Sequence, residues 1–120
     1  MNLFIKEFEA ILEKAASQNK PYWAVIPKEY NRTLIYAYGQ SKERGNQLID
    51  FNEVVWDYDV EPIVSTLRSL GVKEFTFSST MASGIDILAG FKKLDAVIQD
   101  VVYVNNYKKE KIPAILMKIN

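Results

Sequence analysis

Two helical patterns flank a short strand pattern between residues 59 and 94, and this arrangement limits the possible folds most. In the first pattern, apolar residues recur at intervals of three and four, which is the spacing of one helix face. These residues are Val60, Ile63, Val64, Leu67 and Leu70. Asp59 stands at the expected N-cap, and Gly71 ends the helix because glycine adopts positive φ without a steric cost.

A strand pattern follows over residues 73–78. Phe75 and Phe77 alternate with Thr76 and Ser78. This period of two predicts a half-buried strand, with the phenylalanines on the buried face.

A run of hydroxyl side chains leads from that strand into a second helix, which ends near Leu94. Ser79, Thr80 and Ser83 are each suited to cap it, and residues 83–86 match the acidic variant of the capping box. The expected buried stripe of this helix consists of Met81, Ile85, Leu88 and Phe91.

The N-terminal segment predicts a helix from about Leu3 to Gln18. Its apolar residues share one face, and Asn2 is suited to cap it. Pro21 follows the end of the pattern, where the ring restrains the preceding residue and cannot donate within a helix.

A further helix is predicted from Pro27 to about Arg44, with Gly45 as its terminator. The alternative is a strand over residues 33–38, which are rich in β-branched and aromatic side chains. Polar residues that share a helical face favour the helix. Residues 46–57 are too apolar for a free loop and predict a short strand or extended segment that covers the core.

Two more strands are predicted near the C-terminus, over residues 97–104 and 112–119. A helix joins strand 73–78 to strand 97–104, so these two should be parallel, with a right-handed crossover. The last strand is apolar on both faces, which places it between the other two.

The predicted fold is therefore a small mixed sheet that contains a split β-α-β unit, with the strand order first, third, second (1-3-2). Three to four helices pack around it, in a two-layer α+β or α/β architecture. At 120 residues, the chain (residues 1–120) is predicted to form a single domain.

The composition excludes several kinds of chemistry. The sequence has no histidine and no cysteine, so histidine-based triads, thiol nucleophiles, disulfides and ordinary zinc sites are excluded within one chain. No cofactor or metal is predicted. Fifteen basic residues balance fifteen acidic ones, and this neutral balance argues against a dedicated nucleic-acid binder.

The sequence also predicts a cytoplasmic protein. No apolar run reaches the ~18 residues of a membrane span. The first residues carry an acidic side chain early and lack the long apolar segment of a secretory signal.

The hydroxyl cluster of Ser78, Ser79, Thr80 and Ser83 is the first candidate site. It lies between the carboxyl end of a strand and the start of a helix, where free N–H groups and the helix dipole favour an anion. Capping alone also explains these residue types, and neither known phosphate-loop motif is present.

A group of acidic residues is the second candidate, as a site for a hard cation or for carboxylate catalysis centred on Asp57 and Asp59. Its members are Asp50, Glu53, Asp57, Asp59 and Glu61. Their spacing does not match a calcium loop. The favoured interpretation is an exposed acidic rim, because unpaired carboxylates are normally solvated.

Aromatic residues with polar tips are the third candidate, since they are frequent in both cores and interfaces. Trp23 and Trp56 are assigned to the core. Tyr36, Tyr58 and Tyr107 have polar neighbours and are candidates for an interface.

Four segments together resemble an uncharacterised family of short proteins from phages and conjugative elements of Gram-positive bacteria. They are Asn19-Lys20-Pro21-Tyr22-Trp23, Val55-Trp56-Asp57, residues 71–80, and Ile112-Pro113-Ala114. The resemblance covers most of the chain. It implies no activity, cofactor or catalytic residue, and it points to an accessory protein of a mobile element.

The sequence favours a non-catalytic interaction module, with a protein partner or a second copy of the chain. The alternative is a protein that binds a small anionic ligand, such as a phosphate or nucleotide, at the corner from Ser78 to Gly84. An enzyme that works through carboxylates is the third hypothesis.

Overall fold

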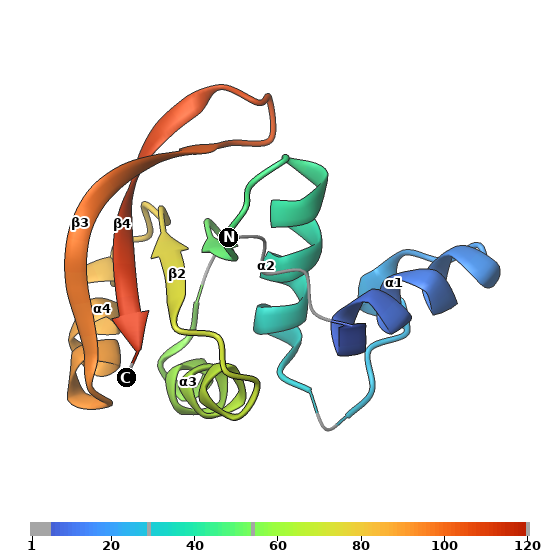
Figure 1. Ribbon diagram of the computed structural model, residues 1–120, viewed down its shortest axis with the longest axis horizontal. Coiled ribbons are helices and arrows are strands. Elements are labelled where there is room, and N and C mark those ends of the chain that lie inside the picture. Colours follow the sequence, from blue (N-terminus) through green and yellow to red (C-terminus); the bar gives the residue numbers. More distant parts are fainter. Residues whose placement is uncertain (1–5, 29, 54, 120) are drawn as a thin grey trace.

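A mixed four-stranded sheet organises the computed structural model, which describes residues 6–28, 30–53 and 55–119. Its strand order is β1-β2-β4-β3 (Figure 1). The strands are β1 (Asp50–Phe51), β2 (Glu74–Phe77), β3 (Ala96–Asn105) and β4 (Lys111–Ile119). Together with the helices, this sheet gives an α+β fold.

The predicted three-strand order 1-3-2 is wrong for this sheet, because residues 50–51 add a fourth strand at the edge. β1 pairs in parallel with β2, with Asp50 opposite Thr76. β4 lies between β2 and β3 and is antiparallel to both. The prediction that the last strand is central is confirmed, and the short strand expected within residues 46–57 is β1.

The helical segments are α1 (Lys6–Ser17), η1 (Tyr22–Ala24), α2 (Arg32–Glu43), η2 (Asp57–Asp59), α3 (Val60–Ser69) and α4 (Gly84–Lys93). In Figure 1, α4 lies behind β3 and β4, α2 lies on the side of β1, and α1 packs on α2 away from the sheet. Within the described residues, no helix combines the length and apolar character needed to cross a membrane.

α2 confirms the helix predicted there in preference to the strand, although it begins later than Pro27. Its N-cap is Asn31, whose side-chain oxygen accepts from the backbone N–H of Leu34 at 2.9 Å. Gly45 and Gly71 end α2 and α3 with φ of +77° and +73°, as predicted. The proposed cap Asn2 and the start of the first predicted helix lie outside the described residues.

Three phenylalanines join the sheet to α4 in the centre of the core. The Phe75 ring lies 5.4 Å from Phe51 and 5.1 Å from Phe91, measured between ring centroids, and all three side chains are buried. Because large rings remove much apolar surface from water, this cluster fixes β1, β2 and α4 against one another.

The predicted stripe of α4 is wrong at Ile85 alone, because Phe91 is buried and Met81 and Leu88 are partly buried against the core. Ile87 and Phe91, one turn apart, face the core, whereas Ile85 is 80% exposed. Ile85 lies in the first turn of α4, above an open apolar hollow beside Val101 and Pro113, so no element covers it.

The prediction that β2 is half-buried is also wrong, because Thr76 is buried as well as Phe75 and Phe77. The polar face of β2 is covered because Thr76 donates its hydroxyl to Asp50 of β1 at 2.6 Å. This contact between a buried hydroxyl and a buried carboxylate leads to the candidate site.

Candidate functional site

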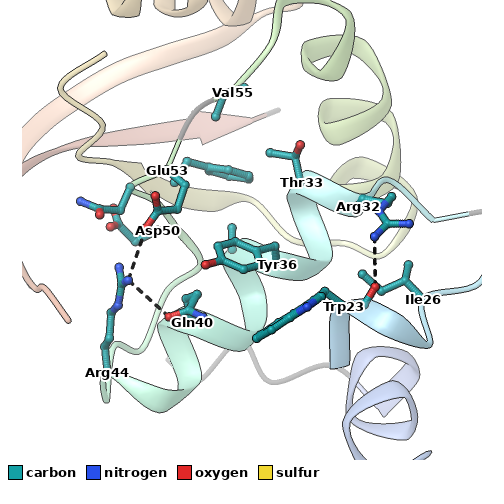
Figure 2. A pocket seen from close by; sticks show the side chains of 13 residues that line it. Trp23, Ile26, Arg32, Thr33, Tyr36, Gln40, Arg44, Asp50, Glu53 and Val55 are labelled. Atoms are coloured by element: carbon teal, nitrogen blue, oxygen red, sulfur yellow. Dashed lines mark hydrogen bonds and ion pairs between the residues drawn. The ribbon is translucent and has the colours of Figure 1, made fainter. Parts of the chain in front are cut away.

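A cavity of about 420 Å³ lies between α2 and the segment that contains β1, and it is called the α2 cavity below (Figure 2). One end is polar and is formed by Gln40, Arg44, Asp50, Asn52 and Glu53. The other end combines the apolar side chains of Trp23, Ile26 and Val55 with Arg32 and Thr33. Its volume falls in the range of about 300–1,000 Å³ that is typical of small-molecule sites.

Arg44 is the central charged group of the polar end. It follows the last turn of α2, and its side chain is only 9% exposed. Its Nη2 donates to Gln40 Oε1 at 3.3 Å and lies 3.6 Å from Glu53 Oε1. Its Nε has no hydrogen-bond partner among the described residues. This buried guanidinium has five N–H donors, and its hydrogen bond and ion pair with side chains of the described residues are both long.

Asp50, by contrast, is buried and satisfied by hydroxyls. Its Oδ1 accepts from Thr76 Oγ1 and its Oδ2 from Ser78 Oγ, each at 2.6 Å. Burial raises the pKa of Asp50, while these two hydrogen bonds and the charge of Arg44 act in the opposite direction. The Asp50 backbone N–H donates to the buried Ser41 Oγ at 2.8 Å, which ties β1 to α2.

Aromatic rings form a wall of the cavity. The Trp23 and Tyr36 ring centroids lie 5.9 Å apart with their planes tilted by 57°. Figure 2 shows the Tyr36 ring between the two ends of the cavity, with its hydroxyl directed toward the polar end. Trp23 is 44% exposed, so its assignment to the core is wrong; it covers the cavity from the side of η1.

Tyr22 supports this wall from behind. Gln40 Nε2 donates to the Tyr22 hydroxyl at 2.9 Å, and that hydroxyl donates to the Tyr36 carbonyl at 3.3 Å. Burial is the main cause that raises the Tyr22 pKa to about 12. The Tyr22 ring fits only because Gly39 has no Cβ, since a Cβ there would lie 2.5 Å from Tyr22 Cζ. Tyr22 thereby fixes Gln40, which is one of the contacts of Arg44.

A second buried carboxylate, Asp59 of η2, lies at the opposite end of α2. It accepts from Asn31 Nδ2 at 2.9 Å, from Thr33 Oγ1 at 2.8 Å and from the Trp56 backbone N–H at 3.0 Å. Asp59 therefore joins η2 to the start of α2. The prediction that its side chain caps α3 is wrong, because no such cap bond forms.

The acidic residues do not form the predicted exposed rim. Asp50 and Asp59 are each 3% exposed, because both have donors to replace water. Asp57 is exposed and accepts from the Tyr58 backbone N–H at 2.9 Å. Over residues 6–28, 30–53 and 55–119, no three acidic side chains gather in a way that would hold a metal ion.

The hydroxyl cluster is divided between different roles. Ser78 belongs to the Asp50 group and also accepts from Asn52 Nδ2 at 2.9 Å. Ser79 accepts from the Met81 backbone N–H at 3.4 Å, and Thr80 is exposed. Ser83 occupies the N-cap position of α4 but makes no side-chain cap bond, so the predicted capping box is wrong. Ser78, Ser79 and Thr80 line an apolar hollow of about 340 Å³ beside α4.

The three candidate interface tyrosines lie on different elements. Only Tyr36 lines the α2 cavity. Tyr58 is 70% exposed and stacks against Trp56. Trp56 is itself 54% exposed, so the prediction that it belongs to the core is wrong. Tyr107 is 70% exposed in the β3–β4 connection, where Lys108 Nζ lies 5.6 Å from its ring centroid.

Sequence reasoning missed Arg44 and Gln40 as site residues. The sequence pattern places Gln40 on the polar face of the predicted helix and Arg44 at its end. Their spacing of four is a usable signal, since residues four apart lie on the same side of a helix. Burial of this polar pair depends on residues 50–53, whose position the sequence alone does not give.

A family model described as a domain of unknown function, DUF7698, matches residues 33–119. The chain belongs to this family. The matched range includes Arg44, Asp50 and Glu53 of the polar end, whereas Trp23 and Ile26 lie before it. The prediction of an uncharacterised family is thereby confirmed. Comparisons with curated proteins and with solved structures gave no match.

Proposed function

We propose that the protein is a non-catalytic binding module that holds a small organic molecule with an anionic group in the α2 cavity. The observation that carries this proposal is Arg44, whose buried guanidinium lines the cavity. Among the described residues, its Nε has no hydrogen-bond partner and its Nη2 makes two long contacts. Burying a charge is costly unless hydrogen bonds and an opposite charge compensate it. Asp50 and Glu53 place opposite charges near Arg44, but neither makes a pair of short hydrogen bonds with its guanidinium, and an anionic ligand group would supply such a pair.

The neighbouring groups support binding in preference to proton transfer. Both oxygens of Asp50 already accept short hydrogen bonds from Thr76 and Ser78. Gln40 is held by Tyr22. Side chains that are fixed by one another preorganise a site and lower the entropy cost of binding.

This proposal moves the anion site from the predicted corner to Arg44. The hydroxyl of Ser78 is engaged with a carboxylate, which is itself an anion. Ligand binding at Ser78, Ser79, Thr80 and Ser83 stays a prediction, as do the cytoplasmic location and the link to a mobile element.

The test is a screen of small organic acids, amino acids and nucleotides at ~1 mM by thermal shift, followed by NMR mapping of every hit. A bound ligand stabilises the native state by mass action. We expect hits whose chemical shift changes cluster on α2 and residues 50–53. Arg44→Met should abolish them, whereas Arg68→Met, outside the cavity, should not. A panel without hits, or hits that survive Arg44→Met, would contradict the proposal.

Protein interaction is a second candidate function, and the surface of β3 favours it. This edge strand exposes four large apolar side chains by more than half: Val97, Ile98, Val101 and Tyr103. Ile98, Val101 and Tyr103 pair with alternate residues of β4 and share one face of the sheet, whereas Val97 lies on the other face. Exposed apolar surface of this kind is typical of interaction sites. The strand edge itself is partly closed, because Asp100 Oδ1 accepts from the Val101 N–H at 2.7 Å and Asn46 pairs with the Asn105 backbone.

We therefore propose that a partner would dock on the β3 side chains and on Ile85, and we take a second copy of the chain as the partner to test. Sedimentation of the wild type and of a Val101→Lys, Tyr103→Lys double variant measures this directly. A wild-type dimer that the two lysines convert to monomer supports self-association. A wild-type monomer at ~100 μM, well above the Kd values of stable dimers, contradicts it.

A further inference from the structure

We propose that the ligand of the α2 cavity is a zwitterion, namely a free α-amino acid with an aromatic or large apolar side chain. This inference rests on the function proposed above and names the ligand class. Its carboxylate would bind Arg44, its ammonium group would bind Glu53, and its side chain would lie against the aromatic wall.

The carboxylate position follows from the unused capacity of Arg44. Its contact with Glu53 spans 3.6 Å, beyond the 2.7–2.9 Å of a good charge-assisted hydrogen bond. Its hydrogen bond to Gln40 is long, at 3.3 Å, and comes from a neutral amide. The planar fork of a guanidinium matches a carboxylate with two parallel N–H···O bonds. Neither present neighbour provides such a pair.

The ammonium position follows from Glu53. Its side chain is 54% exposed, and the long contact with Arg44 is its only one among the described residues. Its oxygens therefore have acceptor capacity that Asp50, bonded to Thr76 and Ser78, has already used. A ligand ammonium group is a compact donor that suits a single accessible carboxylate.

The charge balance of the cavity favours a zwitterion over a simple anion. At the polar end, Arg44 and Glu53 place one positive and one negative group 3.6 Å apart, and Asp50 adds a second carboxylate nearby; the other cationic residue of the lining, Arg32, lies at the opposite end, where it donates to the Trp23 carbonyl. A ligand with only a carboxylate would be attracted by Arg44 but repelled by Glu53 and Asp50. An α-amino acid carries opposite charges on adjacent positions and meets both charged side chains with its complement.

The apolar end of the cavity sets the side-chain preference. In Figure 2, the Tyr36 and Trp23 rings extend from the polar end toward Ile26. A ring or a branched aliphatic group placed there would be covered by aromatic faces, whereas a small side chain would leave this wall exposed.

The experiment uses three matched probes: L-phenylalanine, 3-phenylpropionate, which lacks the amine, and 2-phenylethylamine, which lacks the carboxylate. Binding to the whole protein is measured by titration calorimetry and by NMR of the arginine Nε–H signals. We expect L-phenylalanine to bind at least ten times more tightly than either analogue. We also expect its binding to shift the Nε–H signal of Arg44.

Glu53→Gln separates the ammonium contact from the rest of the site. This side chain is exposed, so its substitution should leave folding intact. We expect this substitution to weaken the binding of L-phenylalanine at least tenfold. The affinity for 3-phenylpropionate should stay the same or increase. Glu61→Gln on α3, an exposed position outside the cavity, is the matched control and should change neither affinity.

Two results would overturn the zwitterion and leave the proposed function standing. One is the loss of discrimination: 3-phenylpropionate binds as tightly as L-phenylalanine, or Glu53→Gln leaves the ratio of the two affinities unchanged. The other is that L-phenylalanine, L-tryptophan and L-leucine all fail to bind at 10 mM while other organic acids bind through Arg44. If no compound of the wider screen binds at the cavity, the proposed function itself fails.

Discussion

The two ends of α2 hold two buried carboxylates in very different settings. At the N-terminal end, Asp59 accepts three hydrogen bonds, and each donor belongs to a segment that Asp59 joins. At the C-terminal end, Asp50 is satisfied by Thr76 and Ser78, but the adjacent Arg44 is not. The first cluster is complete without a ligand. In the second, the buried Nε of Arg44 has no hydrogen-bond partner among the described residues.

This difference separates structural polar clusters from binding sites. A complete cluster stabilises the fold, and removing any member leaves another member unpaired. An incomplete cluster contributes little to stability, because the cost of burying its charge is not recovered until a ligand binds. Substitutions at the two ends should therefore affect stability very differently.

Asp59→Ala should cause the largest loss of stability. It would leave the Asn31 amide, the Thr33 hydroxyl and the Trp56 N–H without their acceptor. We expect the free energy of unfolding to fall by about 3 kcal/mol, because the lost hydrogen bonds go to a charged and buried group. Urea denaturation measures the loss. Asp57→Ala, at an exposed position, is the control and should cost less than about 0.5 kcal/mol.

Gly39→Ala should disturb the contacts of Arg44 indirectly, by displacing residues that support them. The new Cβ would lie within 3 Å of three Tyr22 ring atoms, so Tyr22 must move, and Gln40 moves with it. Overpacking of this kind costs about 2 kcal/mol. Gly90→Ala is the matched control: its Cβ would meet Val60 at an ordinary 3.5 Å, and alanine is the better helix former, so stability should hold or rise slightly. Equal losses at both glycines would contradict this account.

The pH dependence of stability should distinguish Asp50 from an ordinary carboxylate. Burial raises its pKa above the ordinary value of 3.8, so the folded state holds this proton more tightly than the unfolded state does. Between 3.8 and the folded pKa, rising pH therefore removes stability through this group. We expect the wild type to lose stability relative to Asp50→Asn as pH rises through this window. A relative gain over the same window would show that the folded pKa is lowered.

The sequence predicted most of the secondary structure because local signals were strong. The positive-φ glycines Gly45 and Gly71 ended α2 and α3 as expected, and the central position of β4 followed from its two apolar faces. These features depend on residues close together in the chain or on one chirality rule.

The sequence predicted four residues of the site, Asp50, Glu53, Ser78 and Tyr36, but only in separate candidate groups, because their meeting depends on contacts between distant residues. The Thr76 and Ser78 hydroxyls were interpreted as an exposed strand face and a helix start, yet both donate to Asp50, more than twenty residues earlier. β1 has only two residues, and a strand so short leaves no periodic pattern. Without β1, the sequence gives no reason for Arg44 to be buried.

Arg44→Met is the smallest expected change in stability and the most direct test of the comparison. Methionine has a similar length and needs no hydrogen bonds, so it removes a buried charge that the protein does not fully compensate. Asp50 loses a favourable charge but keeps both hydroxyl donors. We therefore expect a change of less than about 1 kcal/mol in urea denaturation, in either direction, together with loss of ligand binding. A loss of about 3 kcal/mol or more would show that Arg44 is a structural partner of Asp50, and the two ends of α2 would then be alike.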